Sequence, residues 1–407
     1  MKETCEGRRQ VLRRPPAALA STRVRLAVYC DYPYRRRGRE LSAEQPFSLF
    51  LAGLAPRLDA LVLVGRLDPA PDPFPYVMPA TVGFQALPHY DSLAHPTHAL
   101  RGLVGALRRF WQILSEVDVV WLLGPHPLSL AFAALAALRG RRVILGVRQD
   151  LPEYVRHRHP DARALALLAR LLEGAYLLAA RRCSVVVVGA ELARHYAAAG
   201  QLLLIWVSLV RGEDLLGPAE LAHRDYSGEL TVLSVGRLDS EKNPLLLADV
   251  LLRLRERDPR WRLVVCGDGP LRGALERRLD DLGIRAWADL RGHVAAGEAL
   301  RAVYRASHFF LHISWTEGMP QVLLEALAAR LPMVATAVGG VPEMAREAAL
   351  LIEPDDANAA AAGLLRLAAD ADLRERLVST GAQRASEHTL QAECGRVADF
   401  LGATGRP

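Results

Sequence analysis

Lysine is almost absent from this sequence of 407 residues, whose other basic side chains are all arginine. It occurs only at Lys2 and Lys242, so Lys242 is the one lysine in the interior of the chain. Two interpretations of Lys242 are open at this point. It is a chance surface residue, or it is kept for a particular partner, and its sequence neighbours must decide between the two.

Cysteines and aromatic residues are also few, which excludes several classes of protein. The five cysteines are Cys5, Cys30, Cys183, Cys266 and Cys394. They are odd in number, widely spaced and without a CxxC pair, which argues against a disulfide framework and a zinc site. We therefore expect a cytoplasmic protein. Because aromatic residues make up only 6% of the chain, nucleic acid is not expected as a partner.

Long apolar runs are missing as well. No stretch reaches the ~18 to 20 uninterrupted apolar residues that a membrane span needs. Residues 1–21 carry four arginines without an apolar segment. We expect a basic flexible arm there rather than a secretory signal.

Charge is distributed unevenly between the two halves. Residues 1–210 hold 27 basic and 16 acidic side chains, a net charge of +11. Residues 211–407 hold 24 basic and 29 acidic ones, a net charge of −5. A basic half favours an anionic acceptor or the surface of an anionic membrane as its partner.

Short β-branched runs alternate with longer helical patterns in two successive series. The runs lie at 25–30, 60–64, 118–123, 141–147 and 183–188, and again at 230–235, 262–266, 309–313, 332–336 and 349–354. This alternation predicts α/β domains with parallel sheets covered on both faces. Strand patterning lapses at 209–228, where Gly, Pro and charged residues collect. The sequence therefore predicts two doubly wound domains, 22–210 and 211–388, that face each other across a cleft.

The first strand of the second domain leads into Gly236-Arg237-Leu238-Asp239-Ser240-Glu241-Lys242. Ser240 is placed to cap a helix whose first turn contains Lys242. Cations are unfavourable at a helix N-terminus, so Arg237 and Lys242 make best sense if an anion lies between them. A solvated cluster of these cations with Asp239 and Glu241 is the alternative.

Two glycine-containing turns follow later strands of the same domain. Gly267 opens the turn Gly-Asp-Gly-Pro, which lets the backbone approach a ligand, but Arg272 stands at the third glycine position of a dinucleotide fingerprint. NAD is therefore not expected. Gly339 and Gly340 either expose amides to an anion or form a simple tight turn.

Two glutamates with seven residues between them follow a later strand of the second domain. Glu317 precedes Gly318, Met319 and Pro320, whereas Glu325 lies in a helical run with almost no other polar residue. An unpaired carboxylate in such a run is costly unless a partner satisfies it. Cations and backbone amides at the ends of these strands would bind a diphosphate. The two carboxylates would accept hydrogen bonds from the hydroxyls of polyols attached to its two ends.

Residues 230–385 resemble the retaining glycosyltransferases of group 1, also called GT4-type, which have the two-domain GT-B architecture. The shared motifs are Gly236, Arg237 and Lys242, the turn at 267–270, the glutamates Glu317 and Glu325, and the segment 338–343. Each motif alone is weak, but the combination is specific. The resemblance favours the interpretation of Lys242 as a residue kept for an anion.

The resemblance also implies roles for these residues. The diphosphate of a nucleotide-diphosphate sugar would be held by Arg237 and Lys242. Gly236 and Gly267 would belong to the same donor-binding group. Glu317 would bind the sugar hydroxyls and Glu325 the ribose. Backbone groups of Gly318, Met319 and Pro320 would hold sugar and phosphate, and those of His293 and Val294 the base. The resemblance makes the catalytic set Glu317, Lys242 and Arg237. It implies that no cofactor or metal ion is obligatory. It also implies that helix 389–402 packs back on the first domain.

The first domain departs from the family pattern. A glycine-rich loop often follows the first strand, whereas this chain has a loop with Arg35, Arg36, Arg37 and Arg39. A family histidine is replaced by Arg148, Gln149 and Asp150, and His126 is either its substitute or a structural residue. These residues are the expected acceptor side.

Two further segments carry alternatives. The apolar face of helix 98–116 either packs on the sheet, which we favour, or rests on a membrane. The segment Asp370-Ala371-Asp372 matches the Asp-x-Asp pattern of some metal-binding sites, but its position at the start of a predicted helix favours a role as a helix cap.

The sequence thus predicts a retaining glycosyltransferase of hexosyltransferase type that acts on a lipid, polysaccharide or small-molecule hydroxyl. We expect it in the cytoplasm, peripheral on the inner membrane face. A nucleotide-sugar epimerase of the same architecture, and a nucleotide-sugar-binding protein without transfer activity, are the alternatives.

Overall fold

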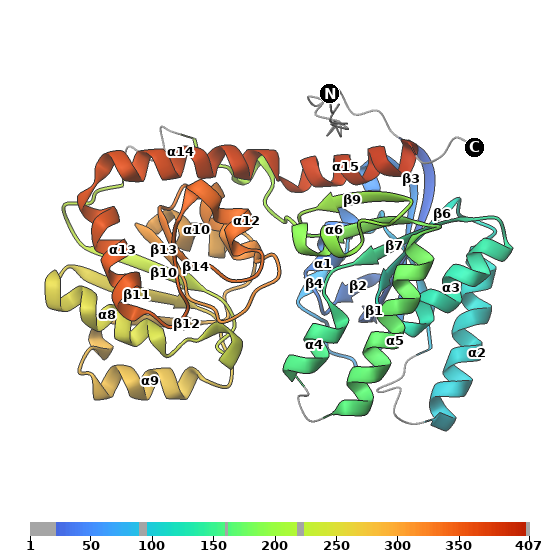
Figure 1. The fold of residues 1–407 in the computed structure, drawn as a ribbon, viewed down its shortest axis with the longest axis horizontal. Coiled ribbons are helices and arrows are strands. Elements are labelled where there is room, and N and C mark those ends of the chain that lie inside the picture. The colour runs from blue at the N-terminus through green and yellow to red at the C-terminus, as the bar shows by residue number, and fades with distance from the viewer. Residues whose placement is uncertain (1–21, 89–95, 159–161, 218–223, 404–407) are drawn as a thin grey trace, which may run out of the picture.

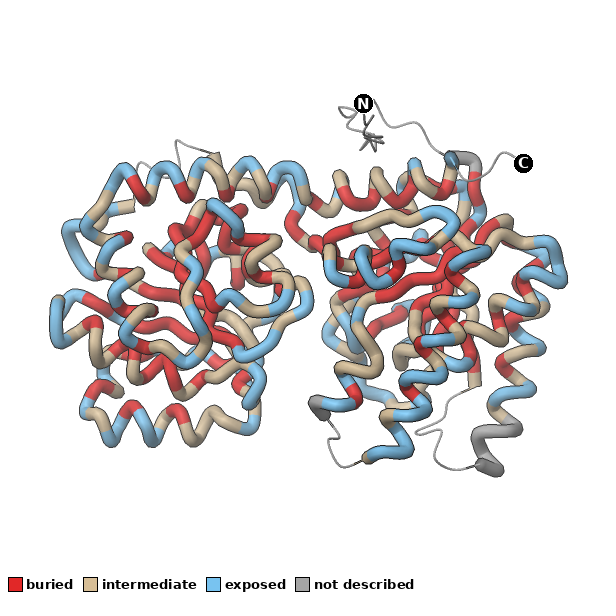
Figure 2. The backbone as a smooth tube through the Cα atoms, viewed as in Figure 1, coloured by how far each residue is buried: buried red, intermediate tan, exposed pale blue. Residues whose placement is uncertain are grey.

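A computed structural model describes residues 22–88, 96–158, 162–217 and 224–403, which form two α/β domains (Figure 1). Each domain has a mainly parallel sheet with helices on both faces, and each has its own hydrophobic core (Figure 2). The prediction of two doubly wound domains is therefore confirmed.

The N-terminal sheet runs in the order β4-β2-β1-β6-β7-β8-β9; β3 also pairs with β1, and β5 pairs with β3. Its strands are β1 (Thr22–Arg37), β2 (Glu40–Ala43), β3 (Leu58–Leu67), β4 (Tyr76–Val77), β5 (Gly83–Leu87), β6 (Val119–Gly124), β7 (Arg142–Val147), β8 (Ser184–Val188) and β9 (Gln201–Ile205). Its helices are α1 (Phe47–Ala52), α2 (Pro96–Ile113), α3 (Pro127–Leu138), α4 (Leu151–Arg158), α5 (Arg163–Ala180) and α6 (Ala190–His195). On α2, Phe110 is fully buried and stacks on Phe132 of α3 at 4.0 Å, and the helix also contacts β5, so its apolar face packs on the domain.

The C-terminal sheet is parallel, in the order β12-β11-β10-β13-β14-β15. Its strands are β10 (Leu230–Val235), β11 (Trp261–Cys266), β12 (Ala288–Gly292), β13 (Phe309–His312), β14 (Met333–Thr336) and β15 (Leu350–Ile352). Its helices are α8 (Leu246–Arg257), α9 (Arg272–Asp281), α10 (Glu298–Ala306), α11 (Gln321–Ala328), α12 (Val341–Ala345), α13 (Ala357–Ala369) and α14 (Ala371–Glu387).

The chain passes between the domains twice. The first passage, near Trp206 and Val210, is joined to the second by stacking of Trp206 on His388 at 3.6 Å and by the bond from Leu390 N to Val210 O. Beyond it, α15 (Leu390–Ala403) packs on β1 and β9 of the N-terminal domain (Figure 1).

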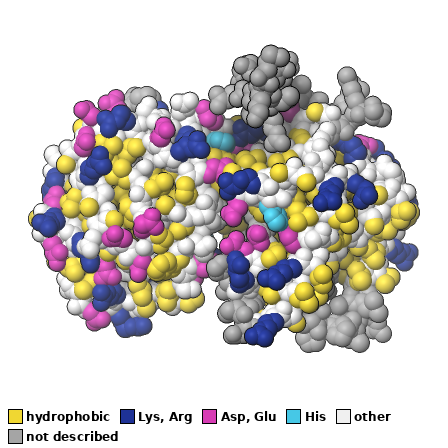
Figure 3. Space-filling model, in the orientation of Figure 1, with side chains coloured by type: hydrophobic (Ala, Val, Ile, Leu, Met, Phe, Trp, Pro, Cys, Tyr) yellow, Lys and Arg dark blue, Asp and Glu magenta, His cyan; other side chains and the backbone are white. Residues whose placement is uncertain are grey.

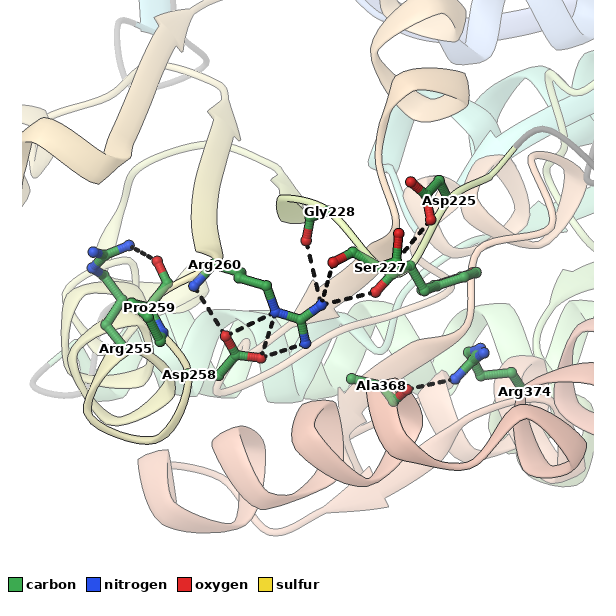
Figure 4. A network of polar contacts seen from close by, with 10 residues as sticks. Asp225, Ser227, Gly228, Arg255, Asp258, Pro259, Arg260, Ala368 and Arg374 are labelled. Atoms are coloured by element: carbon green, nitrogen blue, oxygen red, sulfur yellow. Dashed lines mark hydrogen bonds and ion pairs between the residues drawn. The ribbon is translucent and has the colours of Figure 1, made fainter.

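Arginine side chains fasten the start of the C-terminal domain. Arg260, just before β11, pairs with Asp258 at 2.7 Å and donates to the carbonyl oxygens of Tyr226 and Ser227 (Figure 4). Arg374 of α14 donates to Ala368 O at the end of α13. The contacts of Arg260 lie at the strand starts, opposite the edge that carries the motifs singled out from the sequence.

The segment after the first strand differs from the sequence prediction. Instead of a loop, β1 continues to Arg37 and pairs antiparallel with β2, with Arg35 opposite Ser42 and Arg37 opposite Glu40. Gly38, with φ of 59°, makes the turn. The run of arginines hid the strand because their charges mask the alternation of inward and outward positions.

Candidate functional site

The loops that follow the strands of the C-terminal sheet lie side by side, because parallel strands end at one edge. In sheet order these loops begin at His293 after β12, Gly267 after β11, Gly236 after β10 and Ile313 after β13. The bond from Gly267 N to Gly292 O, 2.7 Å long, and that from Gly236 N to Cys266 O join neighbouring loops. The structure thus brings together the loops of Gly236, Gly267 and His293, which the sequence singled out in separate segments.

The glycines in these loops allow the backbones of neighbouring loops to pack closely against each other. A Cβ at Gly267 would come within 1.8 Å of Gly236 O, and one at Gly339 within 1.7 Å of Glu317 O. The amide of Gly340 donates to Gly318 O at 2.9 Å. Of the two alternatives left open by the sequence, the structure favours the tight turn at Gly340, because the neighbouring loop already uses its amide.

The centre of this edge is an ion pair between Lys242 and Glu317. Lys242 Nζ lies 2.5 Å from Glu317 Oε1, and the two side chains are 22% and 7% exposed. Two further side chains reach the same oxygen, since Ser314 Oγ donates at 2.7 Å and His312 Nε2 lies 3.0 Å away. Within the part of the chain that the structure describes, no donor contacts the second oxygen, Oε2.

Its charged and hydrogen-bonding neighbours keep Glu317 ionised. Burial alone would raise its pKa, but His312 and Lys242 beside the carboxylate outweigh burial and lower the pKa to about 2. Glu317 is therefore ionised at neutral pH, and the described contacts hold one of its two oxygens.

Sequence reasoning missed His312 and Ser314. His312 is the last residue of the buried strand β13 and Ser314 follows that strand, at the same edge of the sheet as Glu317. Thr336 Oγ1 anchors Ser314 by donating to its carbonyl oxygen at 2.8 Å. Polar residues at the end of an apolar strand were the signal that could have identified them.

Lys242 reaches Glu317 by a different local structure from the one predicted. Ser240, Glu241 and Lys242 form a 3-10 turn, no side chain caps it, and α8 begins only at Leu246. Asn243, in the left-handed region with φ of 49°, and Pro244 separate the two. The prediction that Ser240 caps a helix containing Lys242 is wrong because this break ends the turn.

Arg237 lies apart from the buried pair. Its side chain is 69% exposed and contacts Asp239 at 2.8 Å and Glu241 at 3.5 Å. The solvated cluster considered from the sequence therefore exists, with Arg237 in it and Lys242 turned away from it toward Glu317.

Glu325 lines a cavity of about 80 Å³ together with Asp214 and Arg301. Tyr304 OH donates to Glu325 Oε2 at 2.8 Å. Burial raises the pKa of Glu325 to about 7, the bond from Tyr304 opposes this shift, and the charge of Asp214 adds to it. The protein thus supplies one partner to this carboxylate and leaves it close to the point of ionisation at neutral pH.

The two domains touch beside the Glu317 loop. Glu343 Oε2 of α12 accepts a hydrogen bond of 2.7 Å from Ala190 N, at the start of α6 in the N-terminal domain. A Cβ at Gly189 would lie 3.3 Å from the side chain of Met319. Met319 therefore lies at the domain boundary, next to Gly318 and Pro320, while exposed His293 and half-buried Val294 lie farther along the same edge.

Arg148 is the most distinctive residue on the N-terminal side of the cleft. It follows β7, its guanidinium stacks 4.0 Å from the ring of Phe47, and Nη1 donates to Tyr32 OH. Its Nε is buried without a hydrogen-bond partner. Among the described residues no carboxylate forms an ion pair with it, so this partly buried cation lacks a counter-charge.

The neighbours of Arg148 differ in role. Gln149 is exposed, whereas Asp150 Oδ1 accepts from Glu153 N at 2.8 Å and so caps α4. The structure therefore gives Asp150 a local structural role.

His126 also caps a helix, and it belongs to a polar cluster. Its Nδ1 accepts from Leu128 N at the start of α3, and its Nε2 lies 3.5 Å from Asp31 Oδ2. Arg66 Nε lies 3.1 Å from Asp31 Oδ1. Burial lowers the pKa of His126, although Asp31 opposes that shift and Arg66 adds to it. Asp31 and Arg66 escaped sequence reasoning because their strands were recognised only for their apolar residues.

The arginines of the β1–β2 hairpin do not form one basic group. Arg35 pairs with Asp68 at 2.8 Å and stacks on Phe74 at 4.1 Å, and its side chain is only 23% exposed. Arg36 and Arg37 are exposed.

Potential metal ligands do not cluster among the described residues. No group of three or more His, Cys, Asp and Glu side chains there is arranged to hold a metal ion. Asp370 caps α14 by accepting from Leu373 N at 2.8 Å, the role expected from the sequence. Within the described helices, none is both long and apolar enough to cross a membrane.

Comparison with known families agrees with the motifs. Residues 222–384 match the family described as Glycosyl transferases group 1. An alpha-1,4-N-acetyl-D-galactosaminyltransferase of Campylobacter jejuni, named for an acceptor linked through PP to undecaprenol, is 30% identical over 169 residues, which are 40% of this chain and 46% of the relative. The D-inositol 3-phosphate glycosyltransferase of Salinispora tropica is 34% identical over 214 residues, 50% of this chain and 42% of the relative. This chain thus covers less than half the length of either relative.

Solved structures extend the likeness to both domains. Sucrose-phosphate synthase from Thermosynechococcus elongatus superposes with a TM-score of 0.69 at 20% identity, covering 94% of this chain and 100% of that one. The HepE protein of Anabaena, in complex with UDP, gives a TM-score of 0.68 at 16% identity, covering 93% and 100%. The fold is therefore GT-B, as predicted.

Proposed function

Because residues 222–384 match the group 1 glycosyl transferases, we propose that this protein is a retaining glycosyltransferase that uses a nucleotide-diphosphate sugar. The observation that carries the proposal is the pair of Lys242 and Glu317 at the edge where the loops of the C-terminal sheet meet. Among solved neighbours, HepE structures hold UDP and UDP-glucose, which supports a nucleotide-sugar donor.

The proposed reaction exchanges one C–O bond for another. The bond from the sugar to the donor diphosphate breaks, and a bond from the same carbon to an acceptor hydroxyl oxygen forms on the same face. The hydroxyl proton passes to an oxygen of the leaving diphosphate, so no protein base is required; the proposal includes no obligatory metal ion. Lys242 and Arg237 offset the charge that develops on the diphosphate, and the free Oε2 of Glu317 orients the sugar hydroxyls.

Glu325 is proposed to bind the ribose. Its carboxylate faces a cavity beside the strand edge and has one protein donor, Tyr304, so further acceptor positions remain for ribose hydroxyls. Backbone groups at His293 and Val294 are proposed to contact the base.

A donor screen tests the function. Purified protein is incubated with a panel of nucleotide-diphosphate sugars, and nucleotide release is followed with and without a bacterial lipid extract. Release that depends on the extract and yields a glycosylated lipid supports transfer. Release of nucleotide and free sugar without any extract would instead indicate an epimerase-like hydrolysis, and binding without release would indicate a binding protein.

The affinity for UDP should depend on pH through Glu325. A carboxylate accepts from two ribose hydroxyls only when ionised, so binding lowers its pKa below the value of about 7 in the free protein. The ionised fraction rises from about a tenth at pH 6 to about nine tenths at pH 8. We expect the Kd for UDP, measured by calorimetry, to fall about tenfold over this range.

The control for this prediction is Glu325→Gln, which cannot titrate. UDP itself ionises in the same range, but equally for both proteins, so the difference between their slopes isolates Glu325. Parallel slopes for wild type and variant would contradict the assignment of Glu325 to the ribose.

Arg148 is proposed to bind an anionic group of the acceptor, because its buried Nε has no partner and no described carboxylate balances its charge. Arg148→Met should keep the affinity for UDP within about twofold but lower extract-dependent nucleotide release at least tenfold, as expected for a charge-assisted contact. Arg139→Met is the matched control, since Arg139 also stacks on an aromatic ring, that of Trp111 at 4.1 Å. Equal activity of the two variants would remove Arg148 from the acceptor side.

The proposed location is the cytoplasm, with the protein peripheral on the inner face of the membrane. The basic half of the chain, with a net charge of +11, supports an anionic lipid surface as a partner.

A further inference from the structure

Helix α5 exposes an unusual number of leucines. Leu167, Leu168, Leu171 and Leu178 are 59%, 61%, 62% and 55% exposed, and Leu165 is 41% exposed. Single exposed leucines are ordinary on protein surfaces, whereas several on one helix of 18 residues mark a contact surface. In Figure 3 hydrophobic and basic side chains lie side by side on the front of the N-terminal domain, where Figure 1 places α4 and α5.

The leucines lie on one side of the helix. At about 100° per residue, Leu167, Leu171 and Leu178 fall within roughly 40° of one another, and Leu168 lies about 60° beyond Leu171. The inner side of α5 buries Ala169, Glu173, Tyr176 and Ala180 against the domain. The helix is therefore already anchored, and the leucine stripe is a second apolar surface that the described part of the chain leaves uncovered.

Exposed arginines border this stripe. Arg163, Arg170 and Arg181 follow one another at intervals of seven and eleven residues, which places them within roughly 20° of one line along the edge of the stripe. The only acidic residue of α5, Glu173, is buried and accepts from Tyr196 OH at 2.6 Å. We call the set Leu167, Leu168, Leu171, Leu178, Arg163, Arg170 and Arg181 the α5 face; it presents leucine and arginine with no exposed carboxylate of its own helix.

We propose that the α5 face docks the protein on an anionic lipid bilayer. Leucines between arginines are what an interfacial helix requires, because the apolar stripe enters the acyl boundary while the guanidinium groups contact anionic headgroups. Arginine stems add apolar cover while their charged ends stay in the headgroup layer. An apolar protein partner would match the leucines, but not the row of cations.

The position of α5 connects docking with the acceptor side. Helix α4 begins at Leu151, directly after Arg148, Gln149 and Asp150, and packs against α5 (Figure 1). A bilayer on the α5 face therefore lies beside the acceptor end of the cleft. The inference rests on the proposed function in this respect, since it gives a lipid-linked acceptor a direct route to Arg148.

The hairpin of β1 and β2, which the sequence singled out for this role, is less suited to it. Arg35 is taken by Asp68 and Phe74, and the exposed positions 36, 37 and 39 are all arginine, without an apolar side chain between them. The hairpin arginines therefore provide a matched control for charge without apolar insertion.

Vesicle sedimentation tests the docking. The full chain is mixed at 0.1 M salt with vesicles of phosphatidylglycerol and phosphatidylcholine, or of phosphatidylcholine alone. We expect it to sediment with the anionic vesicles only, and to release at 1 M salt, where the Debye length falls from ~10 Å to ~3 Å. The triple variant Leu167→Ser, Leu171→Ser, Leu178→Ser, and the triple variant Arg163→Ser, Arg170→Ser, Arg181→Ser, should each lose at least tenfold in vesicle affinity.

Two control variants should bind as wild type does. The first replaces Arg36, Arg37 and Arg39 by serine, and the second replaces Leu138, which is 77% exposed on α3, by serine. Loss of binding in the hairpin variant, or full binding in the leucine variant of α5, would overturn the proposal. So would a wild type that ignores anionic vesicles, or one that forms dimers through the α5 face instead.

UDP calorimetry separates this inference from the proposed function. All these variants alter exposed residues of the N-terminal domain that make none of the described contacts with Lys242 or Glu317, so their affinity for UDP should equal that of wild type. Vesicle binding without any UDP binding would overturn the function and leave docking standing. UDP binding and nucleotide release without vesicle binding would overturn docking alone.

Discussion

Lys242→Ala is expected to lower turnover by ~10² to 10³, as for the loss of one preorganised charge stabiliser. In the structure Lys242 Nζ lies 2.5 Å from Glu317 Oε1, at the edge where the strand-end loops converge. In the proposed reaction charge moves onto the diphosphate as the sugar leaves, and we propose that the ammonium group of Lys242 offsets that charge. Arg237, 69% exposed and already paired with Asp239 and Glu241, is poorly placed to replace it.

The scarcity of lysine allows a second measurement of the same residue. Only Lys2 and Lys242 carry ε-amino groups, so an amine-acylating reagent followed by mass spectrometry reports on both separately. UDP should protect Lys242 while Lys2 reacts as before. Protection of neither lysine, or near-normal turnover of the alanine variant, would remove Lys242 from the diphosphate site.

The fold should survive this substitution. Breaking a fully buried ion pair costs ~3 to 5 kcal/mol, but Lys242 retains 22% exposure, so water replaces part of the lost interaction. His312 and Ser314 also remain beside Glu317 Oε1. A denaturation midpoint close to that of wild type is the measurement that separates lost chemistry from lost folding.

The position of ten strands along the chain could be predicted, because strands buried on both faces appear as apolar runs. The valine-rich run at 184–188 and the run at 230–235 have no other stable place than a covered parallel sheet. The strands β2, β4, β5, β9 and β12 were not predicted, since each has at most five residues and several mix polar with apolar side chains, as in the segment 288–292. The pairing of β5, β9 and β12 is decided by neighbours distant in sequence, which a local pattern does not contain.

The residues of the candidate site that directly follow predicted strands could be identified from the sequence. Glu317 and Lys242 lie 75 positions apart, yet each follows a recognisable strand of one sheet, so their proximity follows from topology. The sharing of Glu317 Oε1 among Lys242, Ser314 and His312 depends on side-chain geometry and was not predictable. Likewise, the sequence identified Arg148 as unusual, but only the fold shows its Nε buried without a partner.

The surface was the least predictable part. A run of arginines at 35–39 attracts attention in a sequence, whereas the leucines of α5 read as ordinary core residues of an amphipathic helix. Which leucines are exposed depends on where the helix is anchored, and Glu173 and Tyr176 decide that by packing inward.

Glu317→Gln should reduce turnover by ~10² while the affinity for UDP stays equal or rises. The amide is neutral and orients sugar hydroxyls less strongly than a carboxylate, so the chemical step slows. Wild-type Glu317, with a pKa of about 2, holds Lys242 as an ion pair in the absence of ligand. Removing its charge frees the ammonium group for the diphosphate, which is why UDP binding should not weaken.

Ser314→Ala is the matched control, because it removes one neutral donor to the same Oε1 and leaves the charge of Glu317 in place. It should cost less than tenfold in turnover. Because a pKa of about 2 keeps Glu317 ionised throughout pH 5 to 9, we expect this residue to add no step to the rate profile of wild type over that range. A Glu317→Gln variant with weakened UDP binding and normal turnover of bound donor would reverse the roles assigned to the two glutamates.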